Sequence, residues 1–361
     1  MIRHAEAEGN IYRRAHGQFN GLLIGRAQTQ IRQLKERFLN EDIDAVYSSD
    51  LLRTCATAAA ICEDRGLEIH TTDLLREVNV GEWEDVAWGD IIFNFPEMSD
   101  LFGSDPARWS VAGSESYENV RKRMKQCLCD IGRSHDGQTV AAFSHGFAIR
   151  ALTCELLGVP SHKTNLIPYC DNTAVALLLF ENDELTIEFH SDNSHLERGM
   201  STFATQTWWR DEGERKREDL RYAPFESNRD AALLPSRGTV PLLADMRAEE
   251  PSPCSETVQT ALLDNEPVGF LGLDVEEGCK ESIGWISLIY IKPECRRKGF
   301  GIQLIGQAIS AFRKLNRERL RLEAEPGSAL VNFCEKYGFV NIGNSEQLFL
   351  MEKIIKNSRR Y

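Results

Sequence analysis

The first half of the chain alternates apolar runs with helical segments, and this alternation restricts the fold more than any other feature. Short apolar runs predict strands at 45–49, 67–70, 139–143, 174–180 and 185–189. Helical patterns lie between them at 51–65, 116–133 and 147–157. Strands that alternate with helices form a mainly parallel sheet with helices on both faces. We therefore expect a three-layer α/β/α unit over roughly the first 190 residues.

Two histidines lie where strands of this sheet are expected to end. His4 follows the first apolar residues, and His145 follows the strand at 139–143. Functional groups in such sheets gather at the carboxyl ends of strands. Arg3, Arg53 and Glu77 lie at similar boundaries. Cleavage of a phosphate ester needs this set: cationic donors for the oxygens, a nucleophile in line and an acid for the departing oxygen.

Each residue has a defined role in such a site, although each alone is more often structural. His4 can attack phosphorus through a ring nitrogen and hold the phosphoryl group. Glu77 can protonate the leaving group if desolvation raises its pKa. The phosphate-binding side chains would be Arg3, Asn10, Arg53 and protonated His145. This chemistry requires no metal.

The order of these motifs resembles that of the histidine phosphatase, or phosphoglycerate-mutase-like, superfamily. The resemblance covers Ile2 to about Phe189 and rests on Arg3-His4-Ala5-Glu6, Asn10, Ser48-Ser49-Asp50 through Arg53, Glu77 with Gly81-Glu82-Trp83, and Ser144-His145-Gly146. It implies a phosphohistidine intermediate on His4 and a small phosphomonoester as substrate. Mutases usually carry Arg and Tyr where this chain has Val78 and Val80, so the resemblance favours a phosphatase.

The start of the chain departs from that family. Members carry a full strand before Arg-His in the middle of the sheet, whereas only Met1 and Ile2 precede Arg3 here. A strand usually has about five residues. Either the natural start lies upstream or a central strand is lost. We expect a truncated first strand, with His4 on a frayed terminus and phosphatase activity impaired.

Length and charge set the wider limits. With 361 residues the chain is too long for one ordinary core, and two domains are expected. We assign 1–190 to the first domain, 191–256 to a helix and linker, and 257–361 to the second domain. A net charge of −13 argues against general nucleic-acid binding. No apolar run reaches the roughly 18 residues of a membrane span, and without a leader a cytoplasmic location is expected.

The second half contains a basic, glycine-bearing turn between a strand and a helix. The strand is 283–291 and the helix begins near 302. The turn is Arg296-Arg297-Lys298-Gly299-Phe300-Gly301. Backbone N–H groups at such a turn can bind a pyrophosphate, and the glycines, which have no side chain, let the backbone come close to it.

Residues from about Val258 to Lys353 resemble the GNAT N-acetyltransferase family, a mixed α/β fold. The resemblance rests on Arg296-x-x-Gly299-x-Gly301, the strand ending Leu288-Ile289-Tyr290-Ile291, Leu320-Arg321-Leu322-Glu323, and Phe333-Cys334-Glu335-Lys336-Tyr337-Gly338-Phe339. It implies acetyl-CoA as cofactor, bound by the turn and by Leu288, Ile289 and Ile291, and an amine acceptor on a small molecule or a protein.

The acid and base of this second half stay open. Cys334 stands where many relatives have the tyrosine that protonates the CoA thiolate, so it is the possible general acid. Tyr337 is an alternative if its side chain turns inward. Glu281, Glu323 and Glu325 are candidates for the base, and ordered water is another. The sequence thus favours a bifunctional phosphatase and acetyltransferase; the alternative is a catalytically weak, acetyl-CoA-sensing regulatory protein.

Overall fold

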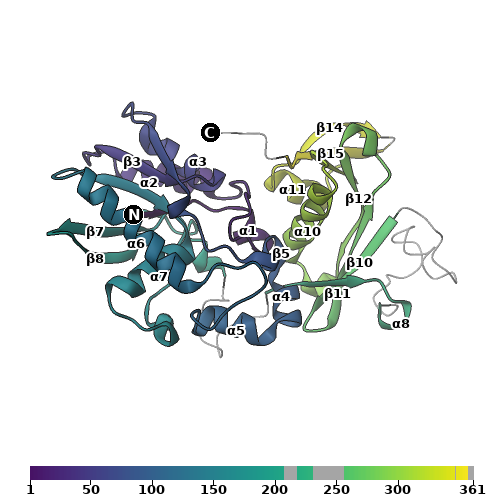
Figure 1. Ribbon diagram of the computed structural model, residues 1–361. Helices are drawn as coiled ribbons and strands as arrows, with labels where there is room; N and C mark the ends of the chain where they lie inside the picture. The colour runs from purple at the N-terminus through teal and green to yellow at the C-terminus, as the bar shows by residue number, and fades with distance from the viewer. Residues whose placement is uncertain (207–217, 231–255, 346, 357–361) are drawn as a thin grey trace.

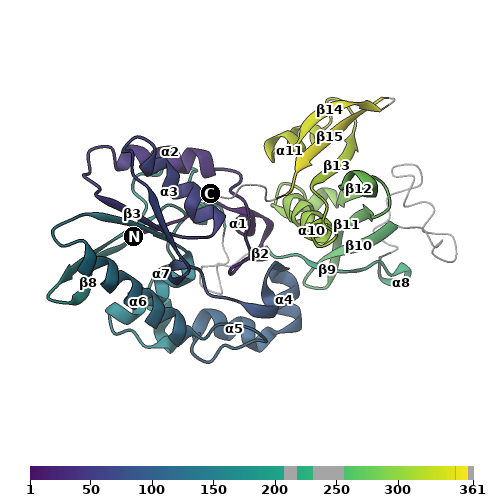
Figure 2. The ribbon, with the colours of Figure 1, turned by 45° about the horizontal axis from the view of Figure 1, so that its top comes forward.

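The computed structural model describes residues 1–206, 218–230, 256–345 and 347–356, and they form two α/β units (Figures 1 and 2). Among these residues, no helix is long and apolar enough to cross a membrane. The interval 191–256, expected to hold a helix and a linker, lies partly outside the described residues.

The first unit is built on a six-stranded sheet in the order β4-β3-β6-β1-β7-β8. Its strands are β1 (Ile2–Arg3), β3 (Ala45–Ser49), β4 (Ile69–Thr72), β6 (Val140–Ser144), β7 (Val175–Glu181) and β8 (Glu184–Asp192). Neighbouring strands from β4 to β1 are parallel. Strand β7 is antiparallel to β1, and β8 is antiparallel to β7. The prediction of a mainly parallel sheet is therefore confirmed.

Helices cover both faces of this sheet. On one face, α2 (Ala27–Arg37) and α3 (Leu52–Cys62) contribute Leu34 and Ile61 to a cluster with the strand residues Val46 and Phe143. On the other, α6 (Tyr117–Ser134) and α7 (Gly146–Leu156) pack in a second cluster around Trp83. Near the cleft described below lie α1 (Glu8–Tyr12) and the short pair β2 (Arg14–Ala15) and β5 (Val86–Ala87).

The first strand is as short as the sequence implied, yet it has its place in the sheet. Ile2 and Arg3 pair with Phe143 and Ser144 of β6, and Ile2 also pairs with Val175 of β7. Ile2 is buried, and the amino group of Met1 donates a hydrogen bond to the carbonyl of Ala176 at 2.6 Å. A two-residue strand with partners on both sides thus delivers His4 from the middle of the sheet, and the expectation that His4 lies on a frayed terminus is wrong.

Two segments differ from the sequence-based expectation. No helix was predicted between 78 and 113, but this stretch contains α4 (Trp88–Asn94) and α5 (Pro96–Ser104), whose aromatic side chains pack around Trp83. Part of the expected linker forms β9 (Arg221–Pro224), an edge strand of the second sheet, followed by α8 (Ser227–Asp230).

The second unit is a mixed seven-stranded sheet in the order β14-β15-β13-β12-β11-β10-β9. Its remaining strands are β10 (Glu256–Leu263), β11 (Glu266–Asp274), β12 (Ile283–Ile291), β13 (Arg319–Ala324), β14 (Val340–Ser345) and β15 (Leu348–Ile354). Two helices, α10 (Phe300–Lys314) and α11 (Ala329–Lys336), pack on it through a core that includes Leu304, Phe312 and Leu320. The expected mixed α/β second fold is confirmed.

Candidate functional site

Three neighbouring parallel strands bring the predicted phosphate site together. His4 follows β1, His145 follows β6 as the N-cap of α7, and Arg53 lies in the first turn of α3 after β3. Because β3, β6 and β1 are adjacent and parallel, their carboxyl ends meet at one edge of the sheet. The imidazole rings of His4 and His145 lie with their centroids 5.2 Å apart.

A large cleft opens at this edge, with a volume of about 1770 Å³. The predicted residues on its walls are Arg3, His4, Asn10, Arg53 and Glu77. His145 is fully buried beside His4, and Gly146 and Phe147 of the next turn line the cleft. The structure thus gathers all six predicted residues in and directly behind one cavity.

The hydrogen bond of His4 determines which of its ring nitrogens carries the proton and which can act as the nucleophile. Its Nδ1 lies 2.7 Å from the carbonyl oxygen of Ala5, which can only accept. Nδ1 therefore carries the proton, and Nε2 keeps the lone pair that a nucleophile needs. The backbone around it is also fixed, because Asn172 donates its amide N–H to the His4 carbonyl at 2.9 Å and Ala5 N–H donates to Thr57 at 3.0 Å.

The two arginines are held by backbone carbonyls. Arg53 donates to the carbonyls of Gly17 at 2.7 Å and Phe19 at 2.9 Å, and Arg3 donates to Cys170 at 2.5 Å. The Nε of Arg3 is buried without a hydrogen-bond partner. Within the described residues, neither guanidinium forms an ion pair with a carboxylate, so both cations can bind an anion.

Burial and these cations determine the charge state of the site. Desolvation, followed by the charge of Arg53, lowers the pKa of both His4 and His145 well below the usual 6.5. Desolvation also lowers the pKa of Arg53 to about 10. The imidazoles are therefore neutral at neutral pH. A bound phosphate dianion would offset the arginine charges and favour the protonated His145 that the sequence analysis expected.

Glu77 approaches the site from the loop after β4 and meets the N-terminus of α7. Its carboxylate accepts hydrogen bonds from the backbone N–H groups of Phe147 at 3.1 Å, Ala148 at 2.9 Å and Val78 at 3.1 Å. The helix that begins next to His145 thus orients the carboxylate at the cleft wall.

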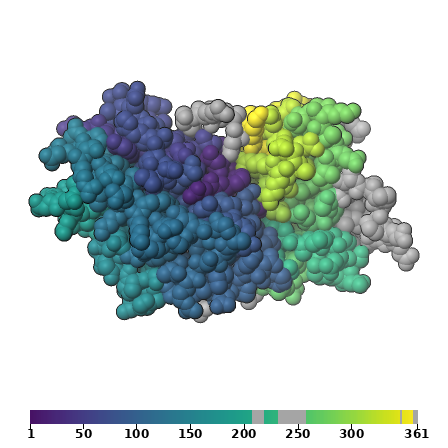
Figure 3. Space-filling view, in the orientation of Figure 1, coloured from purple at the N-terminus to yellow at the C-terminus, as the bar shows by residue number. Residues whose placement is uncertain are grey.

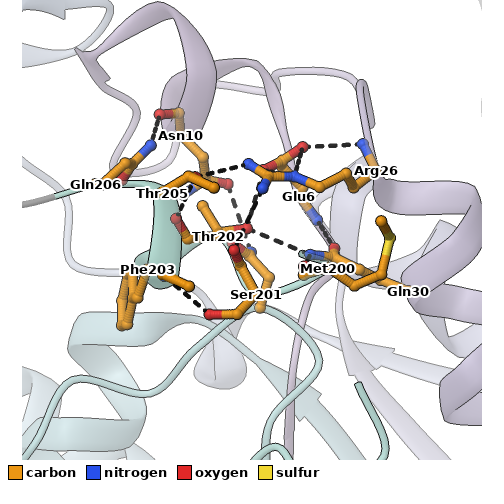
Figure 4. A network of polar contacts seen from close by, with 12 residues as sticks. Glu6, Asn10, Arg26, Gln30, Met200, Ser201, Thr202, Phe203, Thr205 and Gln206 are labelled. Atoms are coloured by element: carbon orange, nitrogen blue, oxygen red, sulfur yellow. Dashed lines mark hydrogen bonds and ion pairs between the residues drawn. The ribbon is translucent and has the colours of Figure 1, made fainter. Parts of the chain in front are cut away.

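A polar network ties the segment 200–206 to the loop that carries His4 (Figure 4). The buried carboxylate of Glu6 accepts from Arg26 at 2.7 Å and from the hydroxyl of Thr202 at 2.9 Å. Gln206 donates to the carbonyl of Asn10 at 2.8 Å, and the ring of Phe203 lies 5.4 Å from the guanidinium of Arg3. The network therefore closes one side of the phosphate site.

Sequence reasoning missed three side chains of this site. His16 lines the cleft, and its ring lies between Gly9 and Gly21. A Cβ added at Gly9 would lie 2.7 Å from a ring atom, and one added at Gly21 would lie 2.1 Å from a ring atom. Ser49 is hydrogen-bonded to Nε2 of His145 at 2.9 Å. Asn172 holds the His4 carbonyl. Ser49 lay inside a quoted motif, whereas His16 and Asn172 had no signal beyond residue type.

The second predicted site is formed where β12 separates from β13. These strands pair only from Ile283–Arg319 to Trp285–Arg321, whereas β12 stays paired with β11 up to Ile291. The part of β12 that carries Leu288, Ile289 and Ile291 therefore has a backbone edge that pairs with no described strand on the β13 side.

The basic turn lies at the start of α10, close to this opening. Gly299 is the N-cap of α10 with a φ of 86°, and a Cβ built on it would meet no more distant part of the described chain within 4 Å. Arg296 donates to the carbonyl of Ile291 at 2.9 Å, and Phe300 is buried. The turn also contributes Arg297, Lys298 and Gly301. An open strand edge beside a basic helix N-terminus fits a ligand with a pyrophosphate and an amide-bearing arm.

The two candidate acids of this second site differ in exposure. Cys334 is fully buried on α11, and desolvation raises the pKa of its thiol to about 12. Tyr337 is partly buried, with its ring 5.1 Å from that of Phe333. The role of Cys334 as a general acid stays a prediction.

Comparison with known proteins assigns both halves to families. The model of the histidine phosphatase superfamily (branch 1) matches residues 1–193, and that of the acetyltransferase (GNAT) family matches residues 208–339. Phosphoserine phosphatase 1 of Hydrogenobacter thermophilus is 32% identical over 181 residues, which are 50% of this chain and 85% of that protein.

Other relatives match the same half. Phosphoglycerate mutase-like protein 4 of Arabidopsis thaliana is 32% identical over 201 residues, 55% of this chain and 86% of its own. The solved structure of Bacillus stearothermophilus YhfR is similar to the first unit, with a TM-score of 0.53 and 25% identity. That likeness covers 54% of this chain and 97% of the other.

Proposed function

The chain belongs to the histidine phosphatase superfamily and carries a GNAT acetyltransferase domain, and on this premise we propose that it is a bifunctional enzyme. The first domain, about residues 1–190, hydrolyses a small phosphomonoester through a phosphohistidine. The second domain transfers an acetyl group from acetyl-CoA to an amine. The observation that carries the first assignment is the pair of imidazoles 5.2 Å apart beside Arg3 and Arg53 in one cleft.

In the first step, Nε2 of His4 attacks phosphorus and forms the P–N bond. Arg3, Arg53 and His145 hold the phosphoryl oxygens, where positive charge stabilises the transition state. The ester P–O bond breaks, its electron pair stays on the leaving oxygen, and Glu77 gives that oxygen a proton. The position of Nε2 opposite the Ala5-bonded Nδ1 supports His4 as the nucleophile.

In the second step, water replaces the histidine. Glu77, now a carboxylate, takes a proton from the attacking water, and the P–N bond breaks as the new P–O bond forms. Phosphate leaves, and His4 regains its neutral, Nδ1-protonated state. Val78 and Val80, which stand where mutases usually carry Arg and Tyr, favour hydrolysis over transfer within the substrate, and phosphoserine phosphatase 1 is a relative with that activity in its name.

For the second domain, the basic turn and the open edge of β12 would hold acetyl-CoA. Bound there, acetyl-CoA supplies an acetyl thioester that an amine can attack. The N–H groups at the start of α10, with Arg296, Arg297 and Lys298, would bind the pyrophosphate. Backbone groups of Leu288, Ile289 and Ile291 would orient the pantetheine arm, and a donor on that strand would stabilise the oxyanion.

A test of the phosphatase measures phosphate release from p-nitrophenyl phosphate by the full chain. We expect turnover that His4→Ala abolishes. His70→Ala is the matched control, because His70 packs on Tyr47 on β3 and is not among the residues that line the cleft. Turnover that survives in His4→Ala, or no turnover by the native chain on any phosphomonoester, would refute the proposal.

A second candidate function for the acetyltransferase half is acetyl-CoA sensing without turnover. The buried thiol of Cys334 favours it, because a group with a pKa of about 12 in the hydrophobic core is poorly suited to proton transfer to the thiolate. Binding of acetyl-CoA without thioester consumption across a panel of amines would support sensing. Consumption with any amine would establish the transferase.

A further inference from the structure

The chain segment that follows His4 lies against helix α10 of the acetyltransferase domain (Figure 3). Tyr12, from the end of α1, belongs to the hydrophobic cluster of the second domain rather than to that of its own. The approach is close: a Cβ added at Gly306 of α10 would lie 2.4 Å from the Cβ of Tyr12. The absence of a side chain at Gly306 thus lets α1 pack directly on α10.

A buried ion pair joins the same two helices. Arg313 of α10 donates to both carboxylate oxygens of Glu8 of α1, at 2.8 and 2.9 Å. The Glu8 side chain is only 2% exposed. Its Oε2 also accepts the backbone N–H of Leu22 at 3.0 Å, so the pair secures both α1 and the loop at Leu22 in the phosphatase domain. A carboxylate this deeply buried depends on its cationic partner.

A second buried group follows immediately along the chain. Arg14 of β2 donates to Asp85 at 2.8 Å, to Ser310 of α10 at 2.8 Å and to Gln307 of α10 at 2.8 Å. Ser310 in turn donates to Asp85 at 2.6 Å. Polar side chains that satisfy one another inside an interface fix its register. The position of α10 along α1 and β2 is therefore set by directional bonds as well as by apolar contact.

Helix α1, which these contacts hold against α10, also forms a wall of the phosphate site. Asn10 lies on α1 two residues after Glu8, and its carboxamide oxygen accepts the N–H of Ala7 at 2.9 Å. Gly9, between them, touches the ring of His16, where an added Cβ would lie 2.7 Å away. A shift of α1 would therefore move Asn10 and release His16, both of which line the cleft.

The second domain reaches the cleft directly as well. Asp219, Leu263 and Asn265 are among the residues that line it, from the chain before β9 and the turn between β10 and β11. Arg13 bridges the boundary through an ion pair with Asp219 at 2.7 Å. The cleft that contains His4 is thus bounded by both domains.

We propose that α10 of the acetyltransferase domain is a working part of the phosphatase site, with Arg313 as its positioning residue. Arg313 acts through Glu8: it holds α1 where Asn10 and His16 can contact the phosphate group. The inference rests on the proposed phosphatase function. It also means that the phosphatase domain reaches full phosphate affinity only with the second domain docked.

The test compares Arg313→Met, Arg313→Lys and a matched control, Arg317→Met, in the full chain. Arg317 lies just beyond α10 and, among the residues that the structure describes, donates only to the carbonyls of Cys279 and Val275 inside the second domain. The measurements are kcat and KM for p-nitrophenyl phosphate, the affinity for inorganic phosphate from thermal shifts, and the thermal shift with acetyl-CoA.

We expect Arg313→Met to raise KM and weaken phosphate binding roughly tenfold, with kcat within about threefold, because it removes binding that substrate and transition state share. The KM and phosphate affinity of Arg313→Lys should lie between those of Arg313→Met and the wild type, because lysine keeps the charge but loses the planar guanidinium that binds both carboxylate oxygens. Arg317→Met should match wild type. The acetyl-CoA shift should be equal in all variants, which distinguishes positioning from general unfolding of the domain.

Unchanged KM and phosphate affinity in Arg313→Met would overturn the inference, and so would equal losses in Arg313→Met and Arg317→Met. If Arg313→Met does not fold, the lysine variant decides, and a wild-type phosphate affinity there overturns the inference. If the native chain binds phosphate but hydrolyses no ester, the proposed function fails, and the phosphate affinities alone still decide whether Arg313 positions the site.

Discussion

Replacing Glu77 by glutamine should separate its two roles, as proton donor and as acceptor at the start of α7. Glutamine keeps one oxygen, which can still accept the N–H groups of Ala148 and Val78. Its amide nitrogen would then face the N–H of Phe147, whose bond at 3.1 Å is lost. One lost hydrogen bond to a charged acceptor costs about 1.5–3 kcal/mol, which lowers Tm by roughly 5–10 °C for a domain of this size.

The catalytic effect should depend on the leaving group. An alkyl phosphate leaves as a basic alkoxide that needs a proton, so kcat/KM should fall by about 10²–10⁴ in Glu77→Gln. p-Nitrophenolate leaves without a proton, so with p-nitrophenyl phosphate the acid is dispensable for cleavage. Because kcat/KM does not include the later hydrolysis of the phosphohistidine, in which Glu77 acts as the base, the loss in kcat/KM on this ester should be under about tenfold. Phosphate release is measured for phosphoserine and p-nitrophenyl phosphate side by side, well below the Tm of the variant.

Equal losses on the two esters would refute Glu77 as the proton donor. Such a result would mean that the substitution acts only through the geometry at the start of α7. Full activity on both esters would exclude both roles. The expected contrast between the esters is therefore sharper evidence than the size of either loss.

Three further results are expected. Tyr12→Phe should leave the free energy of unfolding unchanged or raise it by up to about 1 kcal/mol in thermal melts, because its hydroxyl is buried without a hydrogen-bond partner; a loss above that size would contradict this account. The contribution of His4 and His145 to the free energy of unfolding should be full above about pH 6.5 and fall as the pH drops below it. Their pKa values are lowered in the folded chain, so they stay neutral there, whereas the unfolded chain takes up protons. Thermal melts between pH 7.5 and 5 test this sign. Gly299→Glu should abolish thermal stabilisation by acetyl-CoA, whereas Gly137→Glu, with a similar positive φ in the first domain, should retain it.

The residues proposed for the phosphate site could be located from the sequence because strand ends carry their own signals. The runs ending at Ser49 and Ser144 are short, apolar and followed at once by helices, so the positions of Arg53 and His145 followed from local pattern. The parallel order of β3, β6 and β1 then brings them to His4. Local pattern and global topology agree at this edge of the sheet.

Other features depend on contacts that no local pattern records. Helices α4 and α5 were missed because their apolar residues pack around Trp83 rather than repeat along one helical face. Strand β9 has only four residues and gains its place by pairing with β10. His16 owes its position to contacts with Gly9 and Gly21, which only the folded chain brings together.

The most direct test of the proposed phosphohistidine intermediate is detection of the phosphorylated residue. The full chain is mixed rapidly with an isotopically labelled phosphomonoester, quenched in alkali, where phosphohistidine survives, and mapped by peptide. The account predicts label on His4, formed and lost at rates that match turnover, and no label in His4→Ala. Turnover without a labelled histidine, or label on a residue outside the cleft, would contradict it.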